Sequence, residues 1–184
     1  MIEKVILVDK KDNELALMEK MEAHEKGLLH RAISVFIFNS KNEMLLQRRA
    51  LNKYHSPGVW SNTACTHPRK NEFPIIAANR RLKEEMGMES SIKFAFKFIY
   101  KANLEFDLIE HELDHVFVGI CDELPKINES EVCDYKYISE KELDLDIKRN
   151  SSKYSEWFKI CYKKAYLYAN KNMYNKKKNV VNAF

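Results

Sequence analysis

Residues 66–88 read THPRKNEFPIIAANRRLKEEMGM, and this stretch contains the clearest structural signal of the 184-residue chain. Pro74 suits the first turn of a helix, and Gly87 suits the cap that ends one. Between them, apolar residues recur at helical spacing, at Ile75, Ala78, Leu82 and Met86. The pattern therefore predicts a helix from about Pro74 to Met86, approached by a polar loop.

The charged residues of this stretch have a specific spacing, T-x5-E-x7-R-R-L-x-E-E-M-G-M. It resembles the Nudix box, G-x5-E-x7-R-E-U-x-E-E-x-G-U, in which U is a bulky apolar residue. An ordinary solvated helix face with pairs such as Arg81–Glu85 is the alternative, but it does not explain the upstream position of Glu72. The matching residues are Glu72, Arg80, Leu82, Glu84, Glu85, Gly87 and Met88.

Two positions depart from that box: Thr66 replaces the opening Gly, and Arg81 replaces a Glu. In Nudix proteins a loop–helix–loop holds magnesium against a diphosphate through helix carboxylates, and the hydrolases use clustered carboxylates to activate water. An Arg at position 81 removes one ligand and adds a cation. The protein is thus predicted to bind a diphosphate but to hydrolyse it poorly.

The rest of the chain is expected to form a single domain over 1–184, with a Nudix-like core at about 28–160. A C-terminal helix and basic tail would occupy about 155–184. Hydrophobic residues make up 45 % of the sequence, and the net charge of +4 is concentrated in a tail whose six lysines follow residue 162. Such a tail is more typical of a solvated helix end than of a nucleic-acid arm. The lysines are Lys163, Lys164, Lys171, Lys176, Lys177 and Lys178.

The hydropathy pattern predicts a hairpin formed by Ile33–Phe38 and Met44–Gln47. Further strands are predicted at Val5–Val8, Ile92–Ala102, about Glu110–Ile120, and Val132–Ile138. A loop-like stretch with His24 and His30 precedes the hairpin, and residues 52–73 are predicted to be irregular. Phe94, Phe96, Phe98 and Tyr100 are expected on one strand face. Ser139 with Glu142 forms a capping box, and Ser155–Tyr174 forms an amphipathic helix. The predicted fold class is α/β (α+β), an α/β/α sandwich with a mixed sheet.

Five residues form a candidate ligand set for a metal ion. Glu110 and Glu112 stand two apart at the start of a strand, so both side chains project from one face. Imidazoles and carboxylates together suit Mg²⁺, Mn²⁺ or Zn²⁺. The three histidines of the set are His24, His30 and His67.

Cys65 lies in the polar segment Asn62–Pro68, two residues before the candidate ligand His67. A free Cys often behaves as a small buried hydrophobe, but this context favours a functional thiol. The four cysteines are widely spaced with no CxxC pair, so neither a zinc ribbon nor a disulfide framework is supported. No export signal and no apolar stretch of about 18 residues is present, which predicts a cytoplasmic protein without a membrane contact.

Taken together, these segments resemble the metal-dependent type 1 isopentenyl diphosphate isomerases, a branch of the Nudix superfamily. The likeness covers most of residues 4–160, in family order, and includes the Arg at position 81. It lies in Glu19-Lys20, Ala23-His24, Leu29–Ala32, Gln47–Ala50, Pro57–Trp60, Asn62–Pro68, Glu84–Gly87, Tyr100, Glu110–Glu112 and Tyr154–Trp157.

The resemblance implies an isomerase of isoprenoid precursor biosynthesis that interconverts isopentenyl and dimethylallyl diphosphate through a tertiary carbocation. Cys65 and Glu112 would transfer protons on opposite faces of the substrate, with Tyr100 beside Glu112 and Trp157 facing the cation. The first metal would bind His24, His30, His67, Glu110 and Glu112, and Glu85 would bind a second Mg²⁺ carried by the diphosphate. The substrate-binding cations would be Lys20, Arg49, Lys53 and Arg81.

Several alternatives and expectations accompany this interpretation. The nearest alternative is a Nudix hydrolase of a small diphosphate, and a more distant one is a non-catalytic metal- or nucleic-acid-binding module. The expected partner is a small diphosphate substrate, with no nucleic acid, flavin or nicotinamide. A flavin-dependent isomerase would need a TIM barrel, which is longer than this chain. We expect a monomer, with a weak dimer as the alternative.

Overall fold

The structure is a computed structural model that describes residues 2–53 and 55–174. Over these residues the chain forms one mixed sheet built around β3 (His30–Phe38). That strand runs parallel to β8 (Ile109–Ile120) and antiparallel to β1 (Lys4–Val8), β4 (Met44–Arg49) and β6 (Ala64–Thr66). The remaining strands are β2 (Glu14–Glu19), β5 (Trp60–Ser61), β7 (Ile92–Asn103) and β9 (Val132–Ile138).

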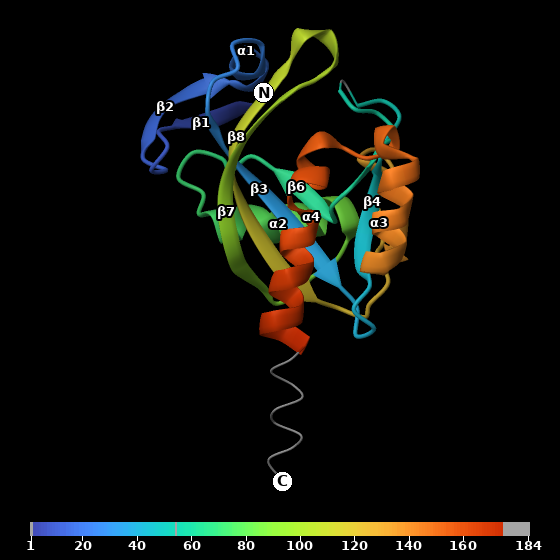
Figure 1. The fold of residues 1–184 in the computed structure, drawn as a ribbon. Helices are drawn as coiled ribbons and strands as arrows, with labels where there is room; N and C mark the ends of the chain where they lie inside the picture. The colour runs from blue at the N-terminus through green and yellow to red at the C-terminus, as the bar shows by residue number, and fades with distance from the viewer. Residues whose placement is uncertain (1, 54, 175–184) are drawn as a thin grey trace.

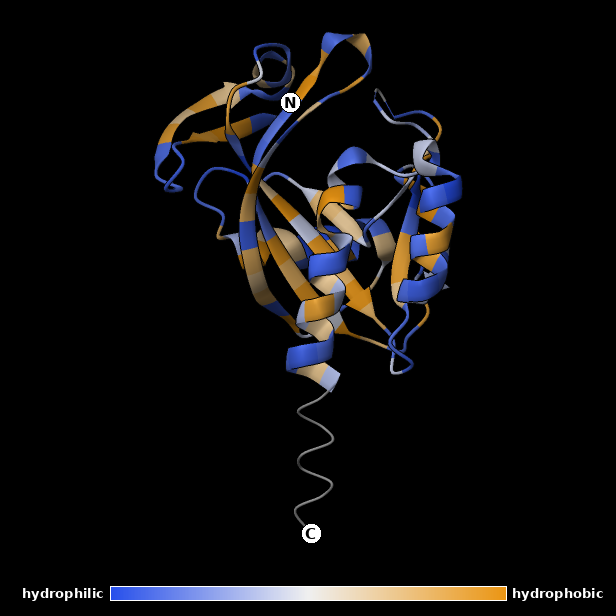
Figure 2. Cartoon of the chain, viewed as in Figure 1, coloured by the Kyte–Doolittle hydropathy of each residue, from blue (hydrophilic) through white to orange (hydrophobic). Residues whose placement is uncertain are grey.

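Helices cover both faces of this sheet, with α2 (Pro74–Met86) behind it and α4 (Glu156–Ala169) in front in Figure 1. The alternation of side chains along β3 explains the two layers. Phe36 and Phe38 pack with α4, whereas Val35 and Ile37 pack with α2. Figure 2 shows hydrophobic residues along the central strands and hydrophilic ones along the outer side of α3 (Glu140–Arg149). The predicted α+β class with a mixed sheet is confirmed.

Helix α2 begins at Pro74 and ends at Met86, as the sequence pattern predicts. Gly87 follows in the left-handed conformation with φ of 61°, and its amide donates to the carbonyl of Lys83. A Cβ atom at Gly87 would lie 2.5 Å from the carbonyl oxygen of Lys126. Glycine is therefore required both by the backbone conformation and by this close approach.

Replacing Gly87 by Ala is expected to lower the free energy of unfolding by at least about 1–2 kcal/mol, because an L-residue is strained in this conformation. Urea denaturation of the two proteins measures the difference. Gly87→Asn separates the two causes, since Asn tolerates the left-handed conformation but still brings a Cβ toward Lys126. An alanine variant as stable as the parent would contradict the prediction.

Three expectations about secondary structure are wrong in part. The stretch after Asn13 that carries His24 and His30 is not one loop, because β2 pairs with β1 as a hairpin and α1 (Lys20–Glu25) follows. Their signal is weak because β2 buries little of either face, and α1 has only six residues. Residues 52–73 contain β5 and β6, which are too short to show a periodic pattern.

The third correction concerns the aromatic residues of β7. The pairing of β7 with β8 shifts register between Phe94 and Phe96, which is a β-bulge. Phe94 consequently packs against Phe117, whose side chain belongs to the α2 layer. Phe96, Phe98 and Tyr100 remain together on the α4 layer.

The end of the chain follows the predicted helix, with a change in its last turn. Ser139 caps α3 through the capping box with Glu142. The helix predicted for Ser155–Tyr174 consists of α4 followed by a π-helical turn from Asn170 to Tyr174. Lys176, Lys177 and Lys178 of the basic tail lie outside the described residues. No helix in the described part of the chain is long and apolar enough to span a bilayer.

Candidate active site

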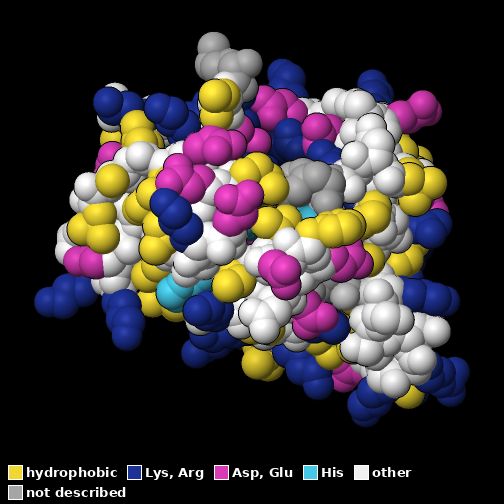
Figure 3. All heavy atoms as spheres, turned by 90° about the horizontal axis from the view of Figure 1, so that it is seen from above, with side chains coloured by type: hydrophobic (Ala, Val, Ile, Leu, Met, Phe, Trp, Pro, Cys, Tyr) yellow, Lys and Arg dark blue, Asp and Glu magenta, His cyan; other side chains and the backbone are white. Residues whose placement is uncertain are grey.

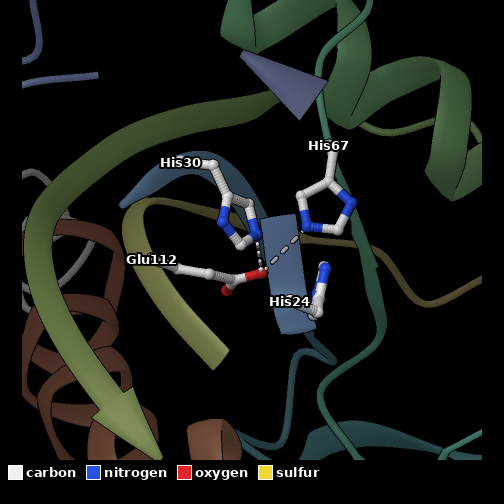
Figure 4. Close-up of side chains that lie close together, drawn as sticks. All are labelled: His24, His30, His67 and Glu112. Atoms are coloured by element: carbon white, nitrogen blue, oxygen red, sulfur yellow. Dashed lines mark hydrogen bonds and ion pairs between the residues drawn. The ribbon is translucent and has the colours of Figure 1, made fainter. Parts of the chain in front are cut away.

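Three histidines and one carboxylate meet at one end of β3 (Figure 4). Each comes from a different element: His24 from α1, His30 from the first position of β3, His67 from just after β6, and Glu112 from β8. One ligand atom of each lies within 4.8 Å of the others. The Oε1 atom of Glu112 lies 2.9 Å from Nε2 of His67 and 3.6 Å from Nε2 of His30. These residues are separated in sequence and are brought together by the pairing of β3 with β6 and β8.

Glu110 adds a second carboxylate to this cluster, on the same side of β8 as Glu112. Its Oε2 atom lies 3.3 Å from Nε2 of His24. The histidine atoms His24 Nε2 and His30 Nε2, and the carboxylate atom Glu110 Oε2, are buried without a hydrogen-bond partner among the described residues. Buried polar atoms normally have a partner, so these three atoms fit the ligands of a cation.

The other ring nitrogens are fixed by the backbone. Nδ1 of His24 bonds the carbonyl oxygen of Lys20 at 2.7 Å, and Nδ1 of His30 bonds that of Leu28 at 2.8 Å. Because a backbone carbonyl accepts a hydrogen bond from Nδ1–H, the proton of the neutral ring stays on Nδ1 and Nε2 keeps its lone pair. A metal-binding histidine requires this tautomer. Burial lowers the pKa of His67 well below its usual value, with help from His30, so this ring is neutral. The cluster is consistent with a divalent metal site.

Cys65 shares the same face of the sheet with Glu112. Cys65 is paired with Ser34 of β3, and Glu112 is paired with His30 of the same strand. Paired residues project to one side, and so do residues an even number of positions apart along a strand. The thiol and the carboxylate therefore flank β3 on the side covered by α4. If they lay on opposite faces, they could not share a substrate.

The two groups have opposite protonation. Burial raises the pKa of the Cys65 thiol to about 12, and the nearby carboxylates of Glu85 and Glu112 act in the same direction. Burial would also raise the pKa of Glu112, but its interactions with His30 and Tyr100 outweigh burial and lower it. At neutral pH the thiol is protonated and the carboxylate is ionised. Paired groups with separated pKa values are typical of acid–base sites.

Tyr100 and Trp157 belong to the buried cluster on the same face of the sheet, against which Cys65 packs. The hydroxyl of Tyr100 donates to Oε2 of Glu112 at 2.6 Å. The indole of Trp157 is buried, and its Nε1 donates to Oδ1 of Asn62 at 3.2 Å. The guanidinium of Arg49 lies 5.4 Å from the centre of the same ring. Trp157 is thus held in place from two sides, and a polar partner satisfies its only donor.

The predicted cations border this site from several elements. Arg49 and Arg81 both lie close enough to oppose the rise in the pKa of Cys65. Lys20 lies close to His67, whose pKa it helps to lower. Lys53 forms an ion pair with Glu131, and Arg81 contacts the same carboxylate. Seen from above the view of Figure 1, Lys, Arg, Asp and Glu side chains are interspersed with hydrophobic ones (Figure 3).

Glu85 does not join the histidine cluster. Its buried carboxylate contacts Gln47 and Arg81 instead, and burial raises its pKa although Arg81 opposes this rise. Arg81 also pairs with Glu84 at 3.4 Å. The guanidinium of Arg81 therefore lies between the helix carboxylates of Glu84 and Glu85.

The structure also adds residues that the sequence pattern does not single out. Glu131 joins Lys53 and Arg81, and its sequence neighbours carry no motif. The ring centre of His55 lies 6.0 Å from that of Trp157, a distance that only the folded chain creates. Asp114 lies on the Glu112 side of β8 and accepts a hydrogen bond of 2.7 Å from Ser34. Burial raises the pKa of Asp114 to about 8.

The fold and the site together define a NUDIX-domain protein, and the NUDIX domain model matches residues 28–158. Similar solved structures include the DR0079 protein of Deinococcus radiodurans, with a TM-score of 0.72 and 17 % identity over 88 % of this chain and 98 % of that one. A MutT protein of Methanosarcina mazei has a TM-score of 0.54 and 20 % identity, over 65 % of this chain and 81 % of that one. At these identities the likeness concerns the fold alone.

Curated relatives identify the family of NUDIX proteins to which the chain belongs. An isopentenyl-diphosphate Delta-isomerase 2 of Aromatoleum aromaticum is 49 % identical over 88 % of this chain and 85 % of its own length. An isopentenyl-diphosphate Delta-isomerase of Pectobacterium atrosepticum is 47 % identical over 86 % of this chain and 88 % of its own length. The chain belongs to the isopentenyl-diphosphate Delta-isomerase family of NUDIX proteins, and the predicted resemblance is confirmed.

Proposed function

We propose that this protein interconverts isopentenyl diphosphate and dimethylallyl diphosphate by adding a proton to the alkene and removing another from the neighbouring carbon. One observation carries the proposal: a protonated thiol, Cys65, and an ionised carboxylate, Glu112, flank one strand on one face of the sheet. A double-bond shift needs one acid and one base at the same hydrocarbon. The names of the relatives state the same isomerisation.

In this proposal Cys65 and Glu112 exchange the roles of acid and base between the two directions of the reaction. One of the two groups adds a proton to the alkene, which produces a tertiary carbocation. The other group then removes a proton from the adjacent carbon. No atom is lost or gained overall. Tyr100 supports this exchange, because its hydroxyl already donates to Glu112 and can follow changes in the protonation of that carboxylate.

Trp157 is proposed to face the carbocation. Its ring carries electron density on its faces and offers no reactive nucleophile, and cation–π attraction contributes on the order of 0.5–2 kcal/mol. The hydrogen bond to Asn62 fixes the ring before substrate arrives. Arg49 contacts the same ring, so it can bind the diphosphate of the substrate while it remains in contact with Trp157.

The metal ligands proposed for the first site are His24, His30, His67, Glu110 and Glu112. A bound Mn²⁺, Mg²⁺ or Zn²⁺ would supply a fixed positive charge that holds Glu112 ionised and oriented. The interaction of His24 with Glu110 raises the pKa of His24 against its burial. A proton and a metal ion therefore compete for this pair, and metal affinity should fall as the pH decreases.

The diphosphate is proposed to bind Lys20, Arg49, Lys53 and Arg81, together with a Mg²⁺ held by Glu85. Charge-assisted hydrogen bonds to phosphate oxygens are strong, and guanidinium groups can bind two oxygens at once. Glu131 now contacts Lys53 and Arg81. When the substrate binds, its phosphate oxygens would either replace the Glu131 carboxylate at Lys53 and Arg81 or contact these two cations together with it.

The test incubates the protein with isopentenyl diphosphate, Mg²⁺ and Mn²⁺ in D₂O. We expect dimethylallyl diphosphate that contains deuterium, because protons are exchanged with solvent-derived ones on the enzyme. A chelator should remove turnover, and added Mn²⁺ should restore it. Release of phosphate without deuterium in the product would instead support a hydrolase and contradict the proposal; heat-inactivated protein is the control.

The remaining expectations belong to the same proposal. We propose a cytoplasmic enzyme that acts as a monomer on a small diphosphate, without nucleic acid, membrane, flavin or nicotinamide. Size-exclusion chromatography with light scattering tests the oligomeric state. Salt-dependent binding to nucleic acid, lost when Lys171, Lys176, Lys177 and Lys178 are replaced by Gln, would contradict the expected set of partners.

A further inference from the structure

His55 is a buried imidazole of the candidate site to which the proposed reaction gives no role. It lies in the segment between β4 and β5, and only 6 % of its surface is exposed. Its ring centre is 6.0 Å from that of Trp157, edge to face, and 6.4 Å from that of His24. Its Nε2 atom lies 3.9 Å from Oε1 of Glu110. The ring of His55 therefore lies between His24 of the histidine cluster and the indole of Trp157.

The segment that carries His55 is fixed by Arg49. The guanidinium of Arg49 donates to the carbonyl oxygen of His55 at 3.2 Å and to that of Ser56 at 3.1 Å. The amide of Gly58 donates back to the carbonyl of Arg49 at 3.1 Å. Arg49 in turn contacts the ring of Trp157. His55 is consequently held in a defined place relative to the indole, even though it belongs to an irregular segment.

Glu110 gives His55 a chemical task. One carboxylate oxygen, Oε2, faces Nε2 of His24 at 3.3 Å and has no hydrogen-bond partner among the described residues. The other oxygen, Oε1, faces the imidazole of His55. A group that contacts the second oxygen of a ligating carboxylate decides how the first oxygen is presented to the metal. His55 is placed to do this for Glu110.

We infer that His55 is a positioning residue, which orients the Glu110 carboxylate with its Nε2 side and supports the Trp157 indole with its ring edge. The inference rests on the proposed function for its effect on turnover, but its effect on metal binding does not need turnover. It assigns a group outside the five proposed ligands to the metal site. Plain packing against Trp157 is the alternative, and it predicts no effect on metal affinity.

Two variants separate these possibilities. His55→Phe keeps an aromatic ring against Trp157 but removes the nitrogen that faces Glu110. His55→Gln keeps a nitrogen donor at a similar reach but removes the ring. His115→Phe is the matched control, because His115 is equally buried, with 7 % exposed, but lies on the other face of the sheet, where it pairs with Asp12.

Binding of Mn²⁺ alone is measured first, by titration calorimetry and by electron paramagnetic resonance, without substrate. We expect His55→Phe to weaken Mn²⁺ binding by about 10- to 100-fold. His55→Gln and His115→Phe should bind Mn²⁺ as the parent does. Circular dichroism of the metal-free proteins confirms that each variant is folded, and if the Phe variant is not, a loss of affinity in His55→Ala together with its retention in His55→Gln supports the inference.

Turnover is measured next, at saturating Mn²⁺. We expect His55→Phe to recover most of its kcat, and His55→Gln to lose about two- to tenfold in kcat with little change in KM, because the ring contact with Trp157 is gone. Equal Mn²⁺ affinity in His55→Phe and the parent would overturn the inference. A parent protein that binds Mn²⁺ but does not isomerise would instead refute the proposed function, and the metal-binding comparison would still decide the role of His55.

Discussion

Replacing Cys65 by Ala is expected to reduce turnover of isopentenyl diphosphate by about 10²- to 10⁴-fold, the range that one proton-transfer group contributes. Burial and the neighbouring carboxylates raise the pKa of the Cys65 thiol to about 12, so below that pH the group carries the proton that it must donate. Loss of the sulfur leaves no other acid at this position of β6. Steady-state kinetics with Mg²⁺ and Mn²⁺ present measures the loss.

The design of this experiment separates chemistry from structure. Cys65→Ser replaces the thiol by a hydroxyl of similar size, and because a hydroxyl is a much weaker acid, this variant should recover little of the rate. Cys121→Ala is the control, because Cys121 packs against the hydrophobic cluster on the α2 face. Mn²⁺ affinity should be the same in all three variants. Parent-like turnover by Cys65→Ala would refute the proton-transfer role of the thiol.

Replacing Glu112 by Gln is expected to remove both turnover and tight metal binding. Glu112 contacts His67 and His30 through one oxygen and Tyr100 through the other. In the proposed function it is therefore both a metal ligand and a member of the proton-transfer pair. Glutamine keeps the shape of the side chain but has neither the negative charge nor the ability to accept a substrate proton. We expect a fall of about 10²- to 10⁴-fold in kcat.

A comparison with His67→Asn distinguishes the two roles of Glu112. His67 is proposed only as a ligand, so excess Mn²⁺ should restore most of the activity of His67→Asn. Excess Mn²⁺ should not restore Glu112→Gln, because a base is missing as well as a ligand. Glu105→Gln, at an exposed position of the β7–β8 connection, serves as the control. Full rescue of Glu112→Gln by metal would limit this residue to metal binding.

Both predictions depend on the position of β3 between β6 and β8. The strand pairs Ser34 with Cys65 on one side and His30 with Glu112 on the other. A shift of either neighbour by one residue would turn one of the two groups to the α2 face. The register of the sheet therefore decides whether this chain can carry out proton transfer at all.

Several features of the protein could be predicted from its sequence. The bounds of α2 follow from Pro74, Gly87 and the apolar residues between them, because each signal is local and acts within one helical turn. The α+β class follows from the order of periodic segments. The isomerase family follows from the spacing of motifs such as Asn62–Pro68 and Glu110–Glu112, together with the Arg at position 81.

Other features could not be predicted, because their causes are not local. Strand β2 and helix α1 have weak patterns of their own and are stabilised by pairing with β1 and by contacts with β8. The bulge that turns Phe94 to the other face depends on how β7 meets β8. The roles of Glu131 and His55 depend on contacts between segments far apart in sequence.

By itself, the sequence determined the chemical inventory of this protein: a thiol, imidazoles, carboxylates and cations at family spacing, and a helix that begins and ends at Pro74 and Gly87. Only the tertiary structure decided that Cys65 and Glu112 share a face and that Arg81 lies among carboxylates. It also decided that Nε2 of His24 and of His30 have no hydrogen-bond partner within residues 2–53 and 55–174. The physical reason is that local sequence sets backbone preference, whereas burial, pKa and ligand geometry depend on which segments the sheet brings together.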